Sequence, residues 1–325
     1  IDVDGTTNLD AVDVDGAVNF AADVTFADGA DIITASAGTN NVRVGVNAGN
    51  SIASGGNENT VIGDEAGTAL TTGDSNVAIG YNALKSEDAH SFNVAVGRKA
   101  LENMNVGANG FNTAVGQFAG NALTTGVQNT FLGSNAGDAL TDADYNTALG
   151  QSALTTDTLV NQNQTSAVIT GNTAVGYAAG NDVTTGVSDT FVGYSCGANT
   201  TTGGFNTFLG YQAGIGSSST AHTGDENTVV GAEAGTNIQG DADQNTMVGR
   251  SSGLDLTTGD NNLFLGHDAG RTGSPGGSIT TGSNEIVLGD ENISEAHIQV
   301  DWTVASDQRD KTDFTALDLG LDFVK

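Results

Sequence analysis

The chain has very little of several residue types, and each shortage excludes a class of structure. It has one cysteine in 325 residues, so no intrachain disulfide framework exists. Its single proline, Pro275, together with 47 glycines, excludes collagen, which needs much proline and a glycine at every third position. Aromatic residues make up only 6% of the chain, so we expect small and β-branched residues to pack in thin layers.

Basic residues and long apolar runs are also scarce. The chain has 9 basic and 39 acidic residues, a net charge of −30, which excludes nucleic acid as a partner because phosphates would be repelled. The charge favours a surface that resists self-adhesion, and a second interpretation is loose association with divalent cations or a basic partner. No apolar run is long enough to cross a bilayer, so we expect no membrane insertion.

What the chain does have is a repeat. The unit Asn172-Thr-Ala-Val-Gly-Tyr-Ala-Ala-Gly180 recurs in fourteen copies, most often at a spacing of seventeen residues. With the first residue numbered 0, position 3 is Val, Ile or Leu and position 4 is Gly in all fourteen copies, and position 7 is Ala in eleven. A fixed short period predicts an elongated stack of similar coils.

Each repeat predicts one coil of an all-β solenoid. The alternation over positions 1 to 3 indicates a short strand, and the glycine at position 4 a turn or a close approach of backbones. We expect the constant side chains at positions 1 and 3 to point into the coil. The variable position 2 would then face a neighbouring chain or solvent, which places Phe131, Phe191 and Phe208 at chain–chain contacts.

A second stretch of the repeat, Thr-Thr-Gly at positions 12 to 14, predicts a return strand and turn. The fold class is therefore an elongated parallel β-roll or β-helix with coils of about 17 residues over residues 41–292. Asn at position 0 is expected to cap a turn or to form a row of stacked side chains. The longest insertion, Thr155 to Gly171, is expected to form a surface loop.

Residues 1–40 differ from the repeat and predict a thin β-shaft. Ile1-Asp-Val-Asp-Gly5 and Val12-Asp-Val-Asp-Gly16 recur at eleven residues, with sparse apolar residues between them. A single chain of this kind cannot bury enough surface, and thin layers of Ala, Val and Gly cannot supply a core for a monomer. We therefore expect three chains wound together in a parallel homotrimer.

Catalytic and metal-binding patterns are absent from the repeats. His90, His222, His267 and His297 lie in separate repeats or loops without metal-ligand spacing, so we expect no metal site and no cofactor. Cys196 occupies the alanine slot at position 7 and is interpreted as a small buried substitute. The repeats therefore indicate no metabolic enzyme.

The last segment, residues 293–325, leaves the repeat. Its motif Ser306-Asp307-x-Arg309-x-Lys311, followed by an apolar stretch from Leu317 to Val324, resembles the start of the intramolecular chaperone domain of phage tail spikes and fibres. This is the peptidase S74, or endosialidase-type, domain. The resemblance implies a trimerising helical domain that guides folding of the fibre. It also implies Ser306 as nucleophile, Lys311 as its general base, and a cut between Ala305 and Ser306.

The repeats themselves are similar to the head repeats of trimeric adhesins, which form trimers of parallel β-rolls. Together the two resemblances imply a homotrimeric viral tail fibre in the virion, with other tail or baseplate proteins and a host-cell receptor as partners. The first alternative is a bacterial trimeric surface adhesin or matrix fibre. The second is an autoprotease that acts once, through Ser306 and Lys311.

Overall fold

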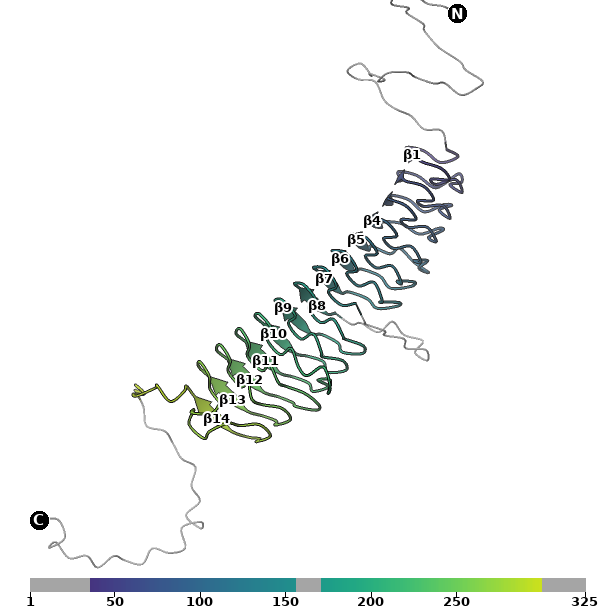
Figure 1. The fold of residues 1–325 in the computed structure, drawn as a ribbon. Helices are drawn as coiled ribbons and strands as arrows, with labels where there is room; N and C mark the ends of the chain where they lie inside the picture. Colours follow the sequence, from purple (N-terminus) through teal and green to yellow (C-terminus); the bar gives the residue numbers. More distant parts are fainter. Residues whose placement is uncertain (1–35, 156–170, 300–325) are drawn as a thin grey trace, which may run out of the picture.

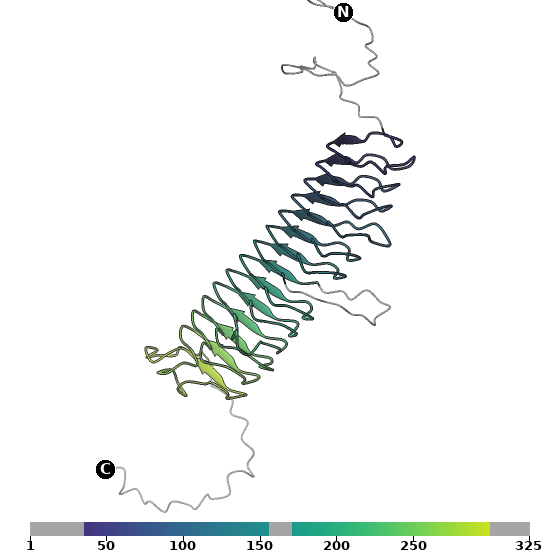
Figure 2. The same ribbon diagram turned by 45° about the vertical axis from the view of Figure 1, so that its right-hand side comes forward.

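The computed structural model describes residues 36–155 and 171–299, and these form one parallel β-solenoid. Figures 1 and 2 show a rod in which each coil contributes one strand to a single sheet that runs along one side. The fourteen strands pair in chain order, which confirms the predicted all-β class and the stack of coils. Their bounds are β1 Val42–Val44, β2 Thr60–Ile62, β3 Val77–Ile79, β4 Val94–Val96, β5 Thr113–Val115, β6 Thr130–Leu132, β7 Thr147–Leu149, β8 Thr173–Val175, β9 Thr190–Val192, β10 Thr207–Leu209, β11 Thr228–Val230, β12 Thr246–Val248, β13 Leu263–Leu265 and β14 Ile286–Leu288.

The register of the sheet follows the repeat numbering, so equivalent positions stack. Thr113 pairs with Thr130 and Thr130 with Thr147, at the common spacing of seventeen residues. The register also holds across the longest insertion, where Thr147 pairs with Thr173. Each column along the rod therefore contains one repeat position.

Each strand is only three residues long because the glycine at position 4 ends it. Gly63 has a φ of +132°, a conformation that L side chains rarely adopt. A Cβ on Gly63 would also lie 2.7 Å from the carbonyl oxygen of Gly80 in the next coil. Both roles predicted for this glycine, the turn and the close backbone approach, are thus confirmed.

The predicted return strand is wrong within the described residues. The Thr-Thr-Gly stretches form bends, and the bridges outside the named strands, such as Thr200 to His222 and His222 to Gly240, join single residues. Single hydrogen bonds still join the coils on this side: the amide and the hydroxyl of Thr124 both donate to the carbonyl oxygen of Thr141, at 2.7 and 2.8 Å. The bends leave too few consecutive extended residues for a second ladder.

The predicted orientation of the strand is also wrong. Position 2 points inward, as at Ala174, and positions 1 and 3 point outward, so Val175 lies on the outer face. Phe131, Phe191 and Phe208 are fully buried within a single chain and do not lie at contacts between chains. One chain thus has a continuous core of Ala, Leu, Val, Met and Phe side chains, contrary to the expectation that a monomer could not supply one.

The core is filled by complementary volumes at positions 2 and 8. The four coils with Phe at position 2 have Gly at position 8, as in the pair Phe131 and Gly137. The three coils with Leu at position 8 have Ala at position 2, as in the pair Ala148 and Leu154. A Cβ on Gly137 would lie 2.6 Å from the Phe131 ring, so a large side chain fits at only one of the two positions.

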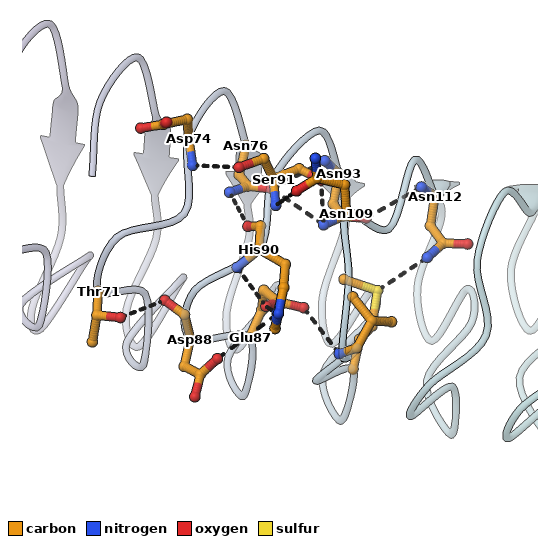
Figure 3. Close-up of polar contacts among 12 residues, drawn as sticks. Thr71, Asp74, Asn76, Glu87, Asp88, His90, Ser91, Asn93, Asn109 and Asn112 are labelled. Carbon is orange, nitrogen blue, oxygen red and sulfur yellow. Dashed lines mark hydrogen bonds and ion pairs between the residues drawn. The ribbon is translucent and has the colours of Figure 1, made fainter. Parts of the chain in front are cut away.

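A row of buried asparagines at position 0 connects the coils. The Oδ1 atom of Asn59 accepts the backbone N–H of Asn76 at 2.9 Å, and its Nδ2 atom donates to the carbonyl oxygen of Gly73 at 2.8 Å. The bond from Oδ1 to the next backbone N–H recurs along the rod, and Figure 3 shows it joining Asn76 to Asn93 and Asn93 to Asn112. The predicted asparagine row is confirmed, and it satisfies backbone groups that would otherwise be buried without partners.

Candidate functional site: the outer face of the sheet

The outer face of the sheet consists of two columns of side chains. Position 1 is threonine in nine of the fourteen strands and aliphatic in the rest, while position 3 is aliphatic in every strand. The largest exposed fractions along these columns include 55% at Val44, 45% at Leu132 and 64% at Ile286. No outward position of the fourteen strands carries a charge, although the chain has 48 charged residues in total, 39 acidic plus 9 basic. An uncharged, largely apolar face of this length indicates a binding surface.

A groove of about 320 Å³ lies on the same face near its C-terminal end. Its lining includes Thr246, Leu263 and Ile286, which are outward residues of β12, β13 and β14. None of its lining residues in the described part of the chain is titratable, so the groove offers apolar and amide contacts and no acid–base chemistry.

Aromatic side chains stack along the column at position 5, beside the sheet. The rings of Tyr177, Tyr194 and Tyr211 follow one another at 5.2 and 5.5 Å and are about half exposed. Nearer the N-terminal end of the rod, the Arg98 guanidinium lies 5.0 Å from the ring centre of Phe118. These stacks connect neighbouring coils on the surface, as the asparagines do inside.

The asparagine row contains one carboxylate, Asp189. Its Oδ1 atom accepts the backbone N–H of Asn206 at 2.8 Å, but its Oδ2 atom is buried and has no hydrogen-bond partner. In the preceding coil, Asn172 donates from Nδ2 to the carbonyl oxygen of Gly186, and a carboxylate has no proton for such a bond. Burial raises the pKa of Asp189 to about 7.

The histidines and the cysteine that the sequence singles out lie apart from one another. His222 is buried against the Phe208 ring, and burial lowers its pKa to about 4. Cys196 is fully buried, and burial raises its pKa to about 12, so it is the inert alanine substitute that was predicted. His297 is exposed and pairs with Glu295 at 3.3 Å.

The fold brings together two clusters, each of one histidine and two carboxylates. The sequence spacing of the histidines alone does not predict them. One contains Glu87, Asp88 and His90, and the other His267, Asp268 and Asp290. The ligand atoms of each cluster lie within 4.8 Å of one another. Ser306 and Lys311, the predicted nucleophile and base, lie outside the described residues, as do most of the predicted shaft and the predicted C-terminal helix.

Comparisons with models of known protein families, with curated proteins and with solved structures found no match. In the part of the chain that the structure describes, there is no helix with the length and apolar character needed to cross a membrane.

Proposed function

We propose that this chain is the repeat section of a homotrimeric viral tail fibre, a structural and host-attachment protein whose three solenoids pack through the outer faces of their sheets. The observation that supports it most is the column at position 3, which is aliphatic in every strand although it points away from the chain's own core. Such a column in water favours coverage by another chain.

The absence of charge from this face favours a second copy of the same chain as its cover. A net charge of −30 would oppose close contact between copies through their other surfaces. An uncharged face allows copies to meet with little of this repulsion. The number three rests on the similarity of the repeats to trimeric adhesin heads and on the resemblance of the Ser306–Lys311 junction to a trimerising chaperone domain.

That junction separates the viral fibre from the bacterial adhesin, which would use the same interface. The motif Ser306-Asp307-x-Arg309-x-Lys311 is typical of phage fibres, and it favours a virion location with tail or baseplate proteins and a host-cell receptor as partners. Imaging of the particle or cell that carries the protein tests the location directly, since a fibre on a bacterial surface would favour the adhesin.

The mass of the assembly tests the trimer. Sedimentation equilibrium of the chain is expected to give three times the protomer mass of 32.5 kDa, without dissociation at micromolar concentration. A folded monomer or a dimer over the same range would contradict the proposal. Val44→Lys and Ile286→Lys, at the two ends of the outer face, serve as a pair of variants that should weaken assembly without unfolding the coils.

A further inference from the structure

The coil that begins at Asn76 departs from the repeat at three positions of its far side. The repeat acts as an internal alignment here, because equivalent positions of neighbouring coils stack. At position 11 this coil has Glu87, where other coils have Leu70, Met104, Leu123 and Leu140. At position 12 it has Asp88, where other coils have Thr71, Thr124 and Thr141. At position 14 it has His90, where other coils have Gly73 and Gly126. All three replacements introduce side chains that bind metal ions.

The three side chains converge on one point. The Nδ1 atom of His90 lies 2.9 Å from Oε1 of Glu87 and 3.9 Å from Oδ1 of Asp88. Figure 3 shows the three side chains gathered at the turn, below the asparagine row. Metal–ligand bonds of about 2.1 Å place neighbouring ligand atoms roughly 3.0–3.5 Å apart, and the two distances lie on either side of that range.

Glu87 makes this more than a group of surface acids. Its side chain is fully buried, and the flanking coils have the apolar residues Leu70 and Met104 at the same position. Within residues 36–155 and 171–299, its one ion-pair partner is His90, which balances the charge only when protonated. The remaining carboxylate oxygen of Glu87 accepts only a long bond of 3.4 Å from the amide of Val106. A buried carboxylate is expensive unless a cation accompanies it.

We propose that Glu87, Asp88 and His90 form a binding site for one divalent transition-metal ion of the zinc class. One imidazole nitrogen and two carboxylate oxygens suit such an ion better than calcium or magnesium, which prefer all-oxygen sites. The ion lies between the Nδ1 atom of His90 and the carboxylates of Glu87 and Asp88, and water completes its coordination. Asp88, with 48% of its side chain exposed, lies at the entrance.

The second cluster provides a contrast within the same chain. His267 and Asp268 are in contact with arginines: Arg250 lies 3.3 Å from the Nε2 atom of His267, and Arg271 donates to Asp268 at 2.7 Å. No residue of that cluster is fully buried. Arginines already occupy the Asp268 carboxylate and the Nε2 atom of His267, so the cluster is expected to bind metal weakly or not at all.

Titration calorimetry of the full chain with zinc chloride tests the site. The parent is expected to bind one equivalent per chain, and zinc is expected to raise its melting temperature. His90→Gly and Glu87→Leu restore the residues of the neighbouring coils, so both should fold while their zinc affinity falls at least tenfold. His267→Ala is the matched control and should bind like the parent.

Two results would overturn the proposal. One is a parent that shows no saturable zinc binding although it is folded by circular dichroism. The other is binding that survives His90→Gly and Glu87→Leu, or that His267→Ala alone removes. A thermal shift in the parent with magnesium or calcium but not with zinc also counts against the site. None of these results depends on the oligomeric state, so the site can fail while the fibre proposal stands.

Discussion

At the scale of single residues, Asp189 shows how strongly the stack depends on an amide at position 0. Between Asn41 and Asn262 it is the one residue of this row that is not asparagine. Its buried Oδ2 atom lacks a partner, whereas a protonated carboxyl could donate to a turn carbonyl as the neighbouring amides do. Burial raises its pKa from 3.8 to about 7, so the folded protein favours the neutral carboxyl below about pH 7.

Asp189→Asn is expected to stabilise the protein at high pH and to change little at pH 4. Because the folded-state pKa is raised, the contribution of Asp189 to stability is fully present below pH 3.8 and is lost as the pH rises to about 7. The gain from the amide should therefore grow across this window and reach a few kcal/mol at pH 8. Chemical unfolding of both proteins at pH 4, 6 and 8 measures it.

Asn172→Asp in the preceding coil is the matched converse. It should lose stability over the same pH window, because it places a second carboxylate in an equivalent buried position. A pH-independent difference between Asp189→Asn and the parent would show that the charge of Asp189 is not what matters.

At the scale of the strand, the two faces of β8 predict opposite outcomes for neighbouring substitutions. Ala174→Asp buries an unpaired charge and should destabilise its coil by several kcal/mol. Val175→Asp lies on the outer face and should leave the coil folded, while its charge weakens assembly. Thermal melting and sedimentation of both variants separate the effects. Loss of the fold in Val175→Asp at low protein concentration would contradict the observed orientation.

The pairing of positions 2 and 8 predicts a rescue. Phe131→Ala leaves a cavity and should cost about 3–5 kcal/mol, and Gly137→Leu should clash with the Phe131 ring. The double variant copies the neighbouring coil, where Ala148 is followed by Leu154 at a φ of +51°. It should therefore be more stable than either single variant. A double-mutant cycle measures the coupling, and additive losses would refute complementary filling.

Much of the element-level structure could be predicted from the sequence, because the period and the invariant glycine at position 4 define coil length and turn. The orientation of the strand could not be predicted from constancy alone. Val175 belongs to a column that is aliphatic throughout, as a core column would be, yet it faces outward. The informative signal was the joint variation of positions 2 and 8, as in Phe131 with Gly137, since only residues that share a core compete for volume.

At the scale of the whole molecule, the junction at Ser306 predicts processing. A chain in which this chaperone domain is folded is expected to release a fragment that begins at Ser306. A lysine acts as a base only when its surroundings hold it neutral, so the cut is expected to require a folded domain around Lys311. N-terminal sequencing of the released fragment measures the cut.

Ser306→Ala and Lys311→Ala should each block release and leave assembly unchanged. Release that survives either substitution, or a fragment that begins elsewhere, would refute the assignment. The predicted pair stays a prediction, because both residues lie outside the described part of the chain.

The cluster at Glu87 could not be predicted from the spacing of the histidines taken one by one. Alignment of Asp88-Ala-His90 with the Thr-Thr-Gly of other coils would have revealed it.

The arrangement of one short strand per coil also determines how the rod carries load. The hydrogen bonds of the sheet run along the rod, so tension between its two ends passes through every coil–coil junction in series. A longer rod is therefore no stronger than its weakest junction. Failure of one junction frees a coil of 17 residues, roughly 55–60 Å of extended chain in place of about 4.8 Å of rod. The solenoid is thus a molecular tether that lengthens in coil-sized steps. Asp189, whose buried Oδ2 atom has no hydrogen-bond partner, marks one junction that is weak near neutral pH.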